Sequence, residues 1–170
     1  TLQKAERTGQ SEALTGAGLA AGFYANELLI KLLERRDAHP VLFAQYSALL
    51  QDLPNSELIE PALRKFEIAL LRELGFGLNL RSSALDDSPI DDAIWYEYHL
   101  ERGLLPVDSA DESSMVFSGV VLRAIDEGDW QSVEVRRAAK RLLRYTIDYY
   151  LDGRELKTRK VYAAMLAGST

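Results

Sequence analysis

The sequence predicts a mainly α-helical protein, a helical bundle that carries one small inserted β-hairpin. Apolar residues recur at helical spacing over most of the 170 residues, while one aromatic segment near residue 95 alternates as strands do. Only 11 Gly and 5 Pro interrupt these patterns, and 47% of the residues are apolar. A chain of this length and composition is sufficient for one compact domain with a buried core.

Three helices are predicted in the first half of the chain. The first spans residues 19–36 and ends before Pro40, because a residue that precedes proline avoids the α region. The second spans residues 41–53. The third runs from about residue 58 to residue 74, where Gly75 offers a left-handed cap.

The second half begins with a polar loop and the hairpin. Residues 94–100 read as an aromatic strand, residues 101–103 as a turn that contains glycine, and residues 104–107 as the return strand. Three further helices are predicted after the hairpin, and the last two are separated by a break at Asp152 and Gly153. They cover residues 118–126, 133–151 and 158–166.

Composition excludes several classes of protein and site. The chain has no cysteine, so it forms no disulfide, thiolate zinc site or iron–sulfur cluster. Its longest uncharged stretch, residues 13–26, is shorter than the roughly 20 apolar residues that span a bilayer, so no membrane association is expected.

No catalytic, metal or cofactor site is predicted. The glycine-rich residues 16–22 resemble a nucleotide-binding loop, but no strand precedes them, which favours small residues that let helices approach closely. His39 and His99 lack partners at the spacing of a metal or catalytic motif. An enzyme is therefore the weakest of the functional classes.

Charge is distributed unevenly along the chain. Residues 136–160 contain nine Lys or Arg against three Asp or Glu, which leaves eleven against 23 for the rest of a chain whose net charge is −6. The helix predicted over residues 133–151 carries a row of cations, and further cations lie after the end of this helix. This arrangement suits DNA phosphates, and a solvated helix face is the alternative. The DNA-binding candidates are Arg137, Lys140, Arg141, Arg144, Lys157 and Arg159.

The third helix contains a second constellation. Arg64, Ile68 and Arg72 are spaced by four residues, which places an apolar side chain between two guanidinium groups, and Lys65 is adjacent. This pattern suits a short peptide that offers a carboxylate and an apolar side chain. The alternative is that Ile68 belongs to the core.

Three stretches together resemble the RecO family of bacterial DNA repair proteins. Residues 24–29 read Tyr-Ala-Asn-Glu-Leu-Leu, residues 62–77 read ALRKFEIALLRELGFG, and residues 156–159 read Leu-Lys-Thr-Arg. The resemblance covers almost the whole chain but begins after the family's N-terminal OB-fold domain. It implies that residues 1–5 end that domain, that residues 6–80 and 110–170 form a helical domain, and that residues 81–109 are the hairpin insert.

The resemblance also implies a function without catalysis. RecO-like proteins bind single- and double-stranded DNA, anneal complementary strands and, with RecR, help RecA displace single-strand-binding protein (SSB), in the bacterial cytoplasm at the nucleoid. Arg64 would receive the terminal carboxylate of the acidic SSB tail, with Lys65 and Arg72 near its acidic residues. The match at Lys157 and Arg159 supports an auxiliary DNA surface.

One departure from the family concerns zinc. Many members hold zinc through two Cys-x-x-Cys pairs that flank the hairpin, and these would fall near Ser83, Asp86, Pro106 and Ser109. Since no cysteine is present, the hairpin must be held by aromatic packing. A generic helical protein-docking module without a nucleic-acid role is the alternative to the RecO-like function.

Overall fold

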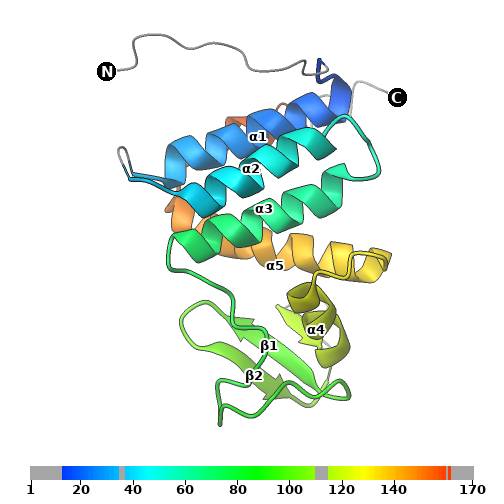
Figure 1. The fold of residues 1–170 in the computed structure, drawn as a ribbon. Coiled ribbons are helices and arrows are strands. Elements are labelled where there is room, and N and C mark those ends of the chain that lie inside the picture. Colours follow the sequence, from blue (N-terminus) through cyan, green and yellow to red (C-terminus); the bar gives the residue numbers. More distant parts are fainter. Residues whose placement is uncertain (1–12, 35–36, 110–114, 160, 162–170) are drawn as a thin grey trace.

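The computed structural model describes residues 13–34, 37–109, 115–159 and 161. Within these described residues, five helices and three strands follow one another (Figure 1). Their order is α1 (Gly16–Leu32), α2 (Pro40–Asp52), α3 (Ile59–Glu73), β1 (Trp95–His99), β2 (Gly103–Val107), β3 (Val116–Ser118), α4 (Gly119–Glu127) and α5 (Val133–Leu151). The predicted class, mainly helical with a small β element, is confirmed.

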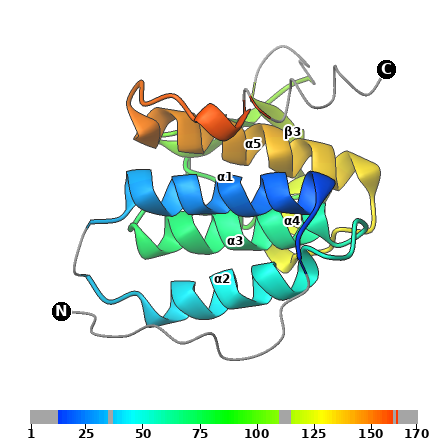
Figure 2. The same cartoon turned by 90° about the horizontal axis from the view of Figure 1, so that it is seen from above.

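Helix α3 lies at the centre of the bundle. It packs against α1, α2 and α5, and the view from above shows α3 between α1 and α2 (Figure 2). Its apolar stripe explains this position, because Phe66, Leu70 and Leu71 are fully buried. The side of the helix that is open to solvent carries the exposed cations Lys65 and Arg72.

The hairpin is part of a three-stranded antiparallel sheet with the order β2-β1-β3. In the register, Trp95 pairs with Val107 and Ser118, and Tyr96 pairs with Pro106 and Phe117. The turn before β2 requires Gly103, whose φ of 87° is unfavourable for residues with a side chain. The third strand was not predicted, because three residues are too few to show an alternating pattern.

Helix α5 connects the bundle to the sheet. It packs on α3 and on α4, and its Tyr145 ring lies edge-on to Tyr98 of β1 at a centroid distance of 6.5 Å. It ends where Asp152 and Gly153 both adopt left-handed backbone conformations. The predicted span of this helix, 133–151, is confirmed, and helical turns resume at Lys157.

The glycine-rich start of α1 brings this helix close to the end of α2. A Cβ atom on Gly18 would lie 2.4 Å from the carbonyl oxygen of Leu53. The prediction that these small residues permit close helix approach is therefore confirmed. Helix α1 begins at Gly16, three residues earlier than predicted, because Gly16 and Ala17 extend the helix without contributing to its apolar pattern.

Two predictions concern residues at the edges of the described chain. Residues 1–5, expected to end an OB-fold, lie outside the described residues, as does most of the helix expected over 158–166. The division at residues 80 and 109 stays a prediction. None of the helices that the structure describes combines the length and apolar composition needed to cross a membrane.

Candidate functional site

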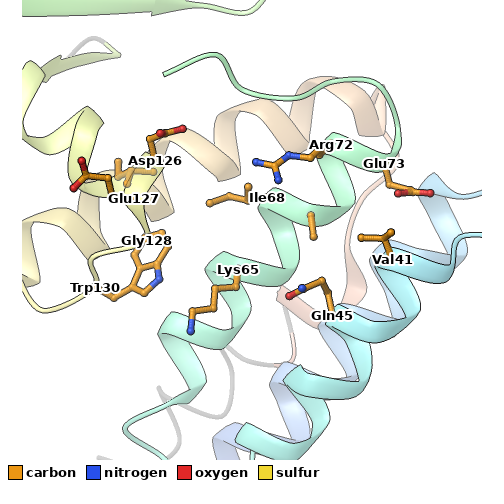
Figure 3. Close-up of a pocket in the computed structure, with 12 residues that line it drawn as sticks. Val41, Gln45, Lys65, Ile68, Arg72, Glu73, Asp126, Glu127, Gly128 and Trp130 are labelled. Carbon is orange, nitrogen blue, oxygen red and sulfur yellow. The ribbon is translucent and has the colours of Figure 1, made fainter. Parts of the chain in front are cut away.

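A groove of about 230 Å³ runs along the exposed side of α3. We call it the α3 groove. Figure 3 shows α3 along the middle of it, α2 on one side, and the end of α4 with the following loop on the other. Its lining residues are Val41, Gln45, Lys65, Ile68, Ala69, Arg72, Glu73, Ile125, Asp126, Glu127, Gly128 and Trp130.

Three of the four residues predicted to bind a peptide lie together in this groove. Lys65 and Arg72 are exposed, and Ile68 between them is half-buried. Ile68 also packs against the core, which is the alternative role considered for it. The groove thus offers two cations around an apolar surface, which suits a peptide with a carboxylate and an apolar side chain.

Carboxylates line the α3 groove as well, and two of them are engaged. Asp126 accepts a hydrogen bond of 2.7 Å from Nε of Arg81, and Glu73 lies 3.0 Å from Nδ1 of His39. The pair with Arg81 reduces the negative charge that an acidic ligand would meet at Asp126. The Nε1 of Trp130 is buried and has no acceptor among the described residues, so the groove also contains an unused donor.

Arg64 does not line the α3 groove. Its side chain is 8% exposed and forms an ion pair of 3.0 Å with the buried carboxylate of Glu67. The Tyr24 hydroxyl donates a 2.7 Å hydrogen bond to the same carboxylate. Burial raises the pKa of Glu67, and Arg64 and Tyr24 offset part of that rise. In this structure Arg64 therefore balances a buried charge inside the bundle.

The cations predicted to bind DNA on α5 point toward different neighbours. Lys140 lies 3.9 Å from Glu60 at the start of α3, and Arg144 lies 3.7 Å from Asp148 one turn further along α5. Arg141 donates a hydrogen bond of 2.7 Å to the carbonyl of Val116 in β3. Arg137 forms no ion pair with another residue in the part of the chain that the structure describes.

A second hollow, of about 500 Å³, lies between the sheet, α4 and the first turns of α5. We call it the sheet pocket. Arg137 and Arg141 both line it, so two of the predicted DNA-binding cations meet at one concave surface. Its lining residues are Trp95, Val116, Phe117, Ser118, Val121, Val133, Glu134, Arg137, Ala138 and Arg141.

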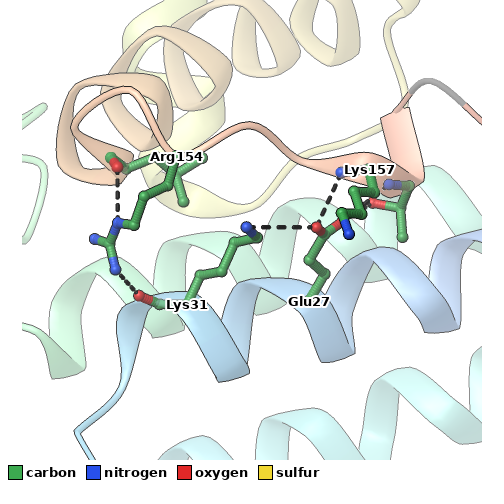
Figure 4. A network of polar contacts seen from close by, with 6 residues as sticks. Glu27, Lys31, Arg154 and Lys157 are labelled. Carbon is green, nitrogen blue, oxygen red and sulfur yellow. Dashed lines mark hydrogen bonds and ion pairs between the residues drawn. The ribbon is translucent and has the colours of Figure 1, made fainter.

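Lys157 and Arg159 lie apart from the sheet pocket, in the turn that follows α5. Glu27 of α1 accepts hydrogen bonds of 2.9 Å from the backbone N–H groups of Lys157 and Thr158 (Figure 4). Arg159 pairs with Asp148, and its guanidinium carbon lies 6.0 Å from the centroid of the Tyr24 ring. The Leu-Lys-Thr-Arg segment is thus fastened to α1 and α5, while the Lys157 side chain stays exposed.

Sequence reasoning missed three residues at these sites. Trp130 lines the α3 groove and Trp95 lines the sheet pocket, whereas the sequence indicates Trp95 only as a residue of the aromatic strand and gives Trp130 no predicted role. Glu27 caps a helical turn that lies 130 residues further along the chain. No local sequence pattern places Trp130 in a groove or reveals the long-range contact of Glu27.

The positions where related proteins would carry zinc ligands are used differently in this chain. Ser83 is buried, and its hydroxyl accepts a hydrogen bond from the N–H of Leu85, while Asp86 accepts one from the N–H of Ser88. These turn contacts and the Ser-Asp-Pro-Ser residue types do not fit zinc, which prefers thiolate and imidazole ligands. Among the described residues, no cluster of three His, Asp or Glu side chains suits a metal ion.

The two histidines each pair with one carboxylate. His39 contacts Glu73, and Nε2 of His99 lies 3.1 Å from Glu97 in the same strand. The two pairs lie on different elements, α2–α3 and β1, and neither histidine lines the α3 groove or the sheet pocket.

Comparison with known proteins places the chain in a family. The sequence model of the family described as "Recombination protein O C terminal" matches residues 14–160. The DNA repair protein RecO of Dechloromonas aromatica is 42% identical over 165 residues, which cover 95% of this chain and 68% of that protein.

Two further relatives carry the same name. The DNA repair protein RecO of Aromatoleum aromaticum is 40% identical over 95% of this chain and 67% of its own length. That of Serratia proteamaculans is 39% identical over 95% of this chain and 66% of its own length. The chain therefore spans about two thirds of these relatives, and it belongs to the RecO family of DNA repair and recombination proteins.

Proposed function

We propose that the chain acts in DNA repair and recombination by binding rather than by catalysis, with separate surfaces for DNA and for a protein partner. The observation that carries the proposal is the row of cations on α5. Arg137, Lys140 and Arg144 are exposed on one helix. Outside the segment 136–160, acidic residues outnumber basic ones by 23 to eleven. Such a surface attracts phosphates, whereas the acidic remainder of the chain repels them.

The ion pairs on α5 are compatible with DNA binding. The nitrogen–oxygen distances are long, 3.9 Å from Lys140 to Glu60 and 3.7 Å from Arg144 to Asp148, and all four side chains are substantially exposed. Exposed pairs of this kind contribute about 0–1 kcal/mol, so a phosphate can replace the carboxylate at little cost. Single- and double-stranded DNA are both proposed as ligands of this row, with Lys157 at its edge.

We further propose that the α3 groove binds the acidic C-terminal tail of SSB. Lys65 and Arg72 would contact the carboxylates of the tail, and its terminal aromatic side chain would pack on Ile68. Arg64 has a positioning role in this arrangement, because its charge is already taken by Glu67. Strand annealing, cooperation with RecR and indirect support of RecA loading would then follow from holding DNA and SSB together at the bacterial nucleoid.

The tail proposal is tested by calorimetric titration with an acidic peptide that ends in phenylalanine. We expect Lys65→Ala and Arg72→Ala each to weaken binding by about 1–3 kcal/mol, the cost of losing a charged hydrogen-bond partner. Arg102→Ala, which removes the same charge from the exposed hairpin turn, is the matched control and should leave the affinity unchanged. Equal affinities for all four proteins would refute this use of the α3 groove.

The DNA proposal is tested by reversing the exposed charges of α5. The variant Arg137→Glu/Lys140→Glu/Arg144→Glu should lose most of its affinity for DNA at low salt, since three attractive contacts become repulsive. Arg141 is left unchanged because it holds β3. A circular dichroism melt controls for folding. Full affinity of the folded variant would show that the row is a solvated face and would favour a protein-docking module without a nucleic-acid role.

A further inference from the structure

The sheet pocket combines aromatic surface with positive charge. Trp95 and Phe117 come from paired strands, and Val121 and Val133 come from α4 and α5. Arg141 lies with its guanidinium carbon 4.6 Å from the centroid of the Phe117 ring, and its bond to the Val116 carbonyl fixes it there. One wall of the pocket is therefore a rigid stack of an aromatic ring and a guanidinium plane.

Arg137 provides the second charge at the rim of the pocket. It lies one helical turn before Arg141, so both side chains project from the same face of α5. Within the described chain Arg137 has no carboxylate partner, in contrast to Lys140 and Arg144. Among the described residues, an incoming anion at Arg137 therefore meets no existing ion pair.

These features match one nucleotide unit of a single strand. A nucleobase is a flat ring that stacks on aromatic side chains and guanidinium planes, and its phosphate carries one charge for one cation. The volume of about 500 Å³ lies within the usual range for small-ligand sites. In a duplex the bases are paired and stacked, so they cannot enter a concave pocket.

We propose that the sheet pocket receives one unpaired base of a single-stranded nucleic acid, with the adjoining phosphate on Arg137. This inference rests on the DNA-binding function proposed above and adds a strand preference to it. An acidic peptide fits less well, because its several carboxylates would meet only two arginines among the described lining residues, and Glu134 also lines the pocket.

The two tryptophans of the chain allow a direct test. Trp95 lies in the sheet pocket and Trp130 lies in the α3 groove, so a Trp130→Phe background makes Trp95 the only tryptophan. We would titrate this protein with a ten-nucleotide oligodeoxythymidine, a DNA duplex with the same number of phosphates, an abasic oligomer of ten phosphates and an acidic peptide.

Stacking on the base predicts that the oligodeoxythymidine quenches Trp95 fluorescence, while the duplex and the abasic oligomer bind without quenching. Arg137→Ala should weaken single-strand binding about tenfold, which matches the loss of one charged contact, and Arg102→Ala should not. Because Arg137 is exposed, the Arg137→Ala variant tests the pocket without disturbing the sheet.

Three outcomes would overturn the inference. They are equal quenching by the duplex or the abasic oligomer, quenching by the acidic peptide in place of the single strand, and single-strand binding with Trp95 unaffected. In the last case the chain still binds DNA, so the proposed function survives without the base pocket. Absence of binding to every nucleic acid would remove both proposals.

Discussion

At the scale of the residue, the different positions of Arg64 and Arg72 follow from helix geometry. Each step of four residues advances about 40° beyond a full turn, so the two side chains differ by about 80° around the axis. Lys65, Ile68 and Arg72 fall on the groove side, whereas Arg64 turns toward Glu67 and Tyr24. The spacing by four residues predicts that these side chains lie on one side of the helix, but it does not predict which of them face the groove and which face the interior. The sequence also did not indicate that Glu67 is buried.

Arg64→Ala should destabilise the protein strongly. Removing the guanidinium leaves the buried carboxylate of Glu67 without its ion-pair partner and with the hydrogen bond from the Tyr24 hydroxyl, and breaking a buried pair in this way costs about 3–5 kcal/mol. Lys65→Ala, on the adjacent exposed position, should change the free energy of unfolding by less than about 0.5 kcal/mol. Urea denaturation of both variants checks this, and similar stabilities would contradict the internal role of Arg64.

Glu27 should make the attachment of the C-terminal turn dependent on pH. Burial raises the pKa of Glu27, but the hydrogen bonds from Thr158 and Lys157 outweigh it and lower the pKa overall. A lowered pKa means that Glu27 stabilises the fold above the ordinary glutamate pKa of about 4.3, and that this stability is lost as the pH falls through the lower folded value.

Glu27→Gln is the variant that tests this role. Its amide group can accept fewer of the three hydrogen bonds, so the variant should be about 1–3 kcal/mol less stable than the native protein at pH 7. The difference should shrink as the pH falls below the ordinary glutamate pKa and through the lowered folded pKa of Glu27, because the native carboxylate is then protonated as well. Denaturation at several pH values measures it, and a difference independent of pH would contradict the account.

At the scale of the element, the sequence predicted the long helices well and the short strand not at all. Helix α5 shows its apolar side over five turns, so its span of Val133–Leu151 was recognisable. Strand β3 has three residues and is defined by pairing with Trp95, Tyr96 and Glu97, which lie some 20 residues earlier. Both concave sites join elements that are distant in sequence, so their full lining required the tertiary structure.

Replacing either of two glycines of α1 by alanine should have different effects on stability. The Cβ of an alanine at Gly18 would clash with the Leu53 carbonyl, so Gly18→Ala should destabilise the protein by about 1–3 kcal/mol. At Gly22 the same atom would meet only side-chain carbons at 3.5 Å, so Gly22→Ala should be neutral or stabilise by up to about 1 kcal/mol through helix propensity. Thermal melts compare the two, and equal effects would argue against the close α1–α2 contact.

At the scale of the whole molecule, uneven charge and two concave sites support the proposal of two separate binding surfaces. The α3 groove and the sheet pocket share no lining residue, and α5 supplies cations only to the sheet pocket. The net charge alone indicates an acidic protein. The uneven distribution of charge along the sequence predicts a basic helix, and the cations Arg137, Lys140 and Arg144 are indeed exposed on α5. Which cations are engaged by carboxylates could not be predicted, because Glu60 reaches Lys140 only in the folded protein.

The central claim, that the cations of α5 bind DNA, is tested most directly by the salt dependence of single-strand binding. Each neutralised phosphate of a single strand contributes about −0.7 to the slope of log affinity against log salt. Contacts from Arg137, Lys140 and Arg144 predict a slope of about −2, which should approach zero in the variant with all three reversed to Glu. A native protein that binds no single-stranded DNA at low salt, or binds it with an unchanged slope after the reversal, would contradict the account.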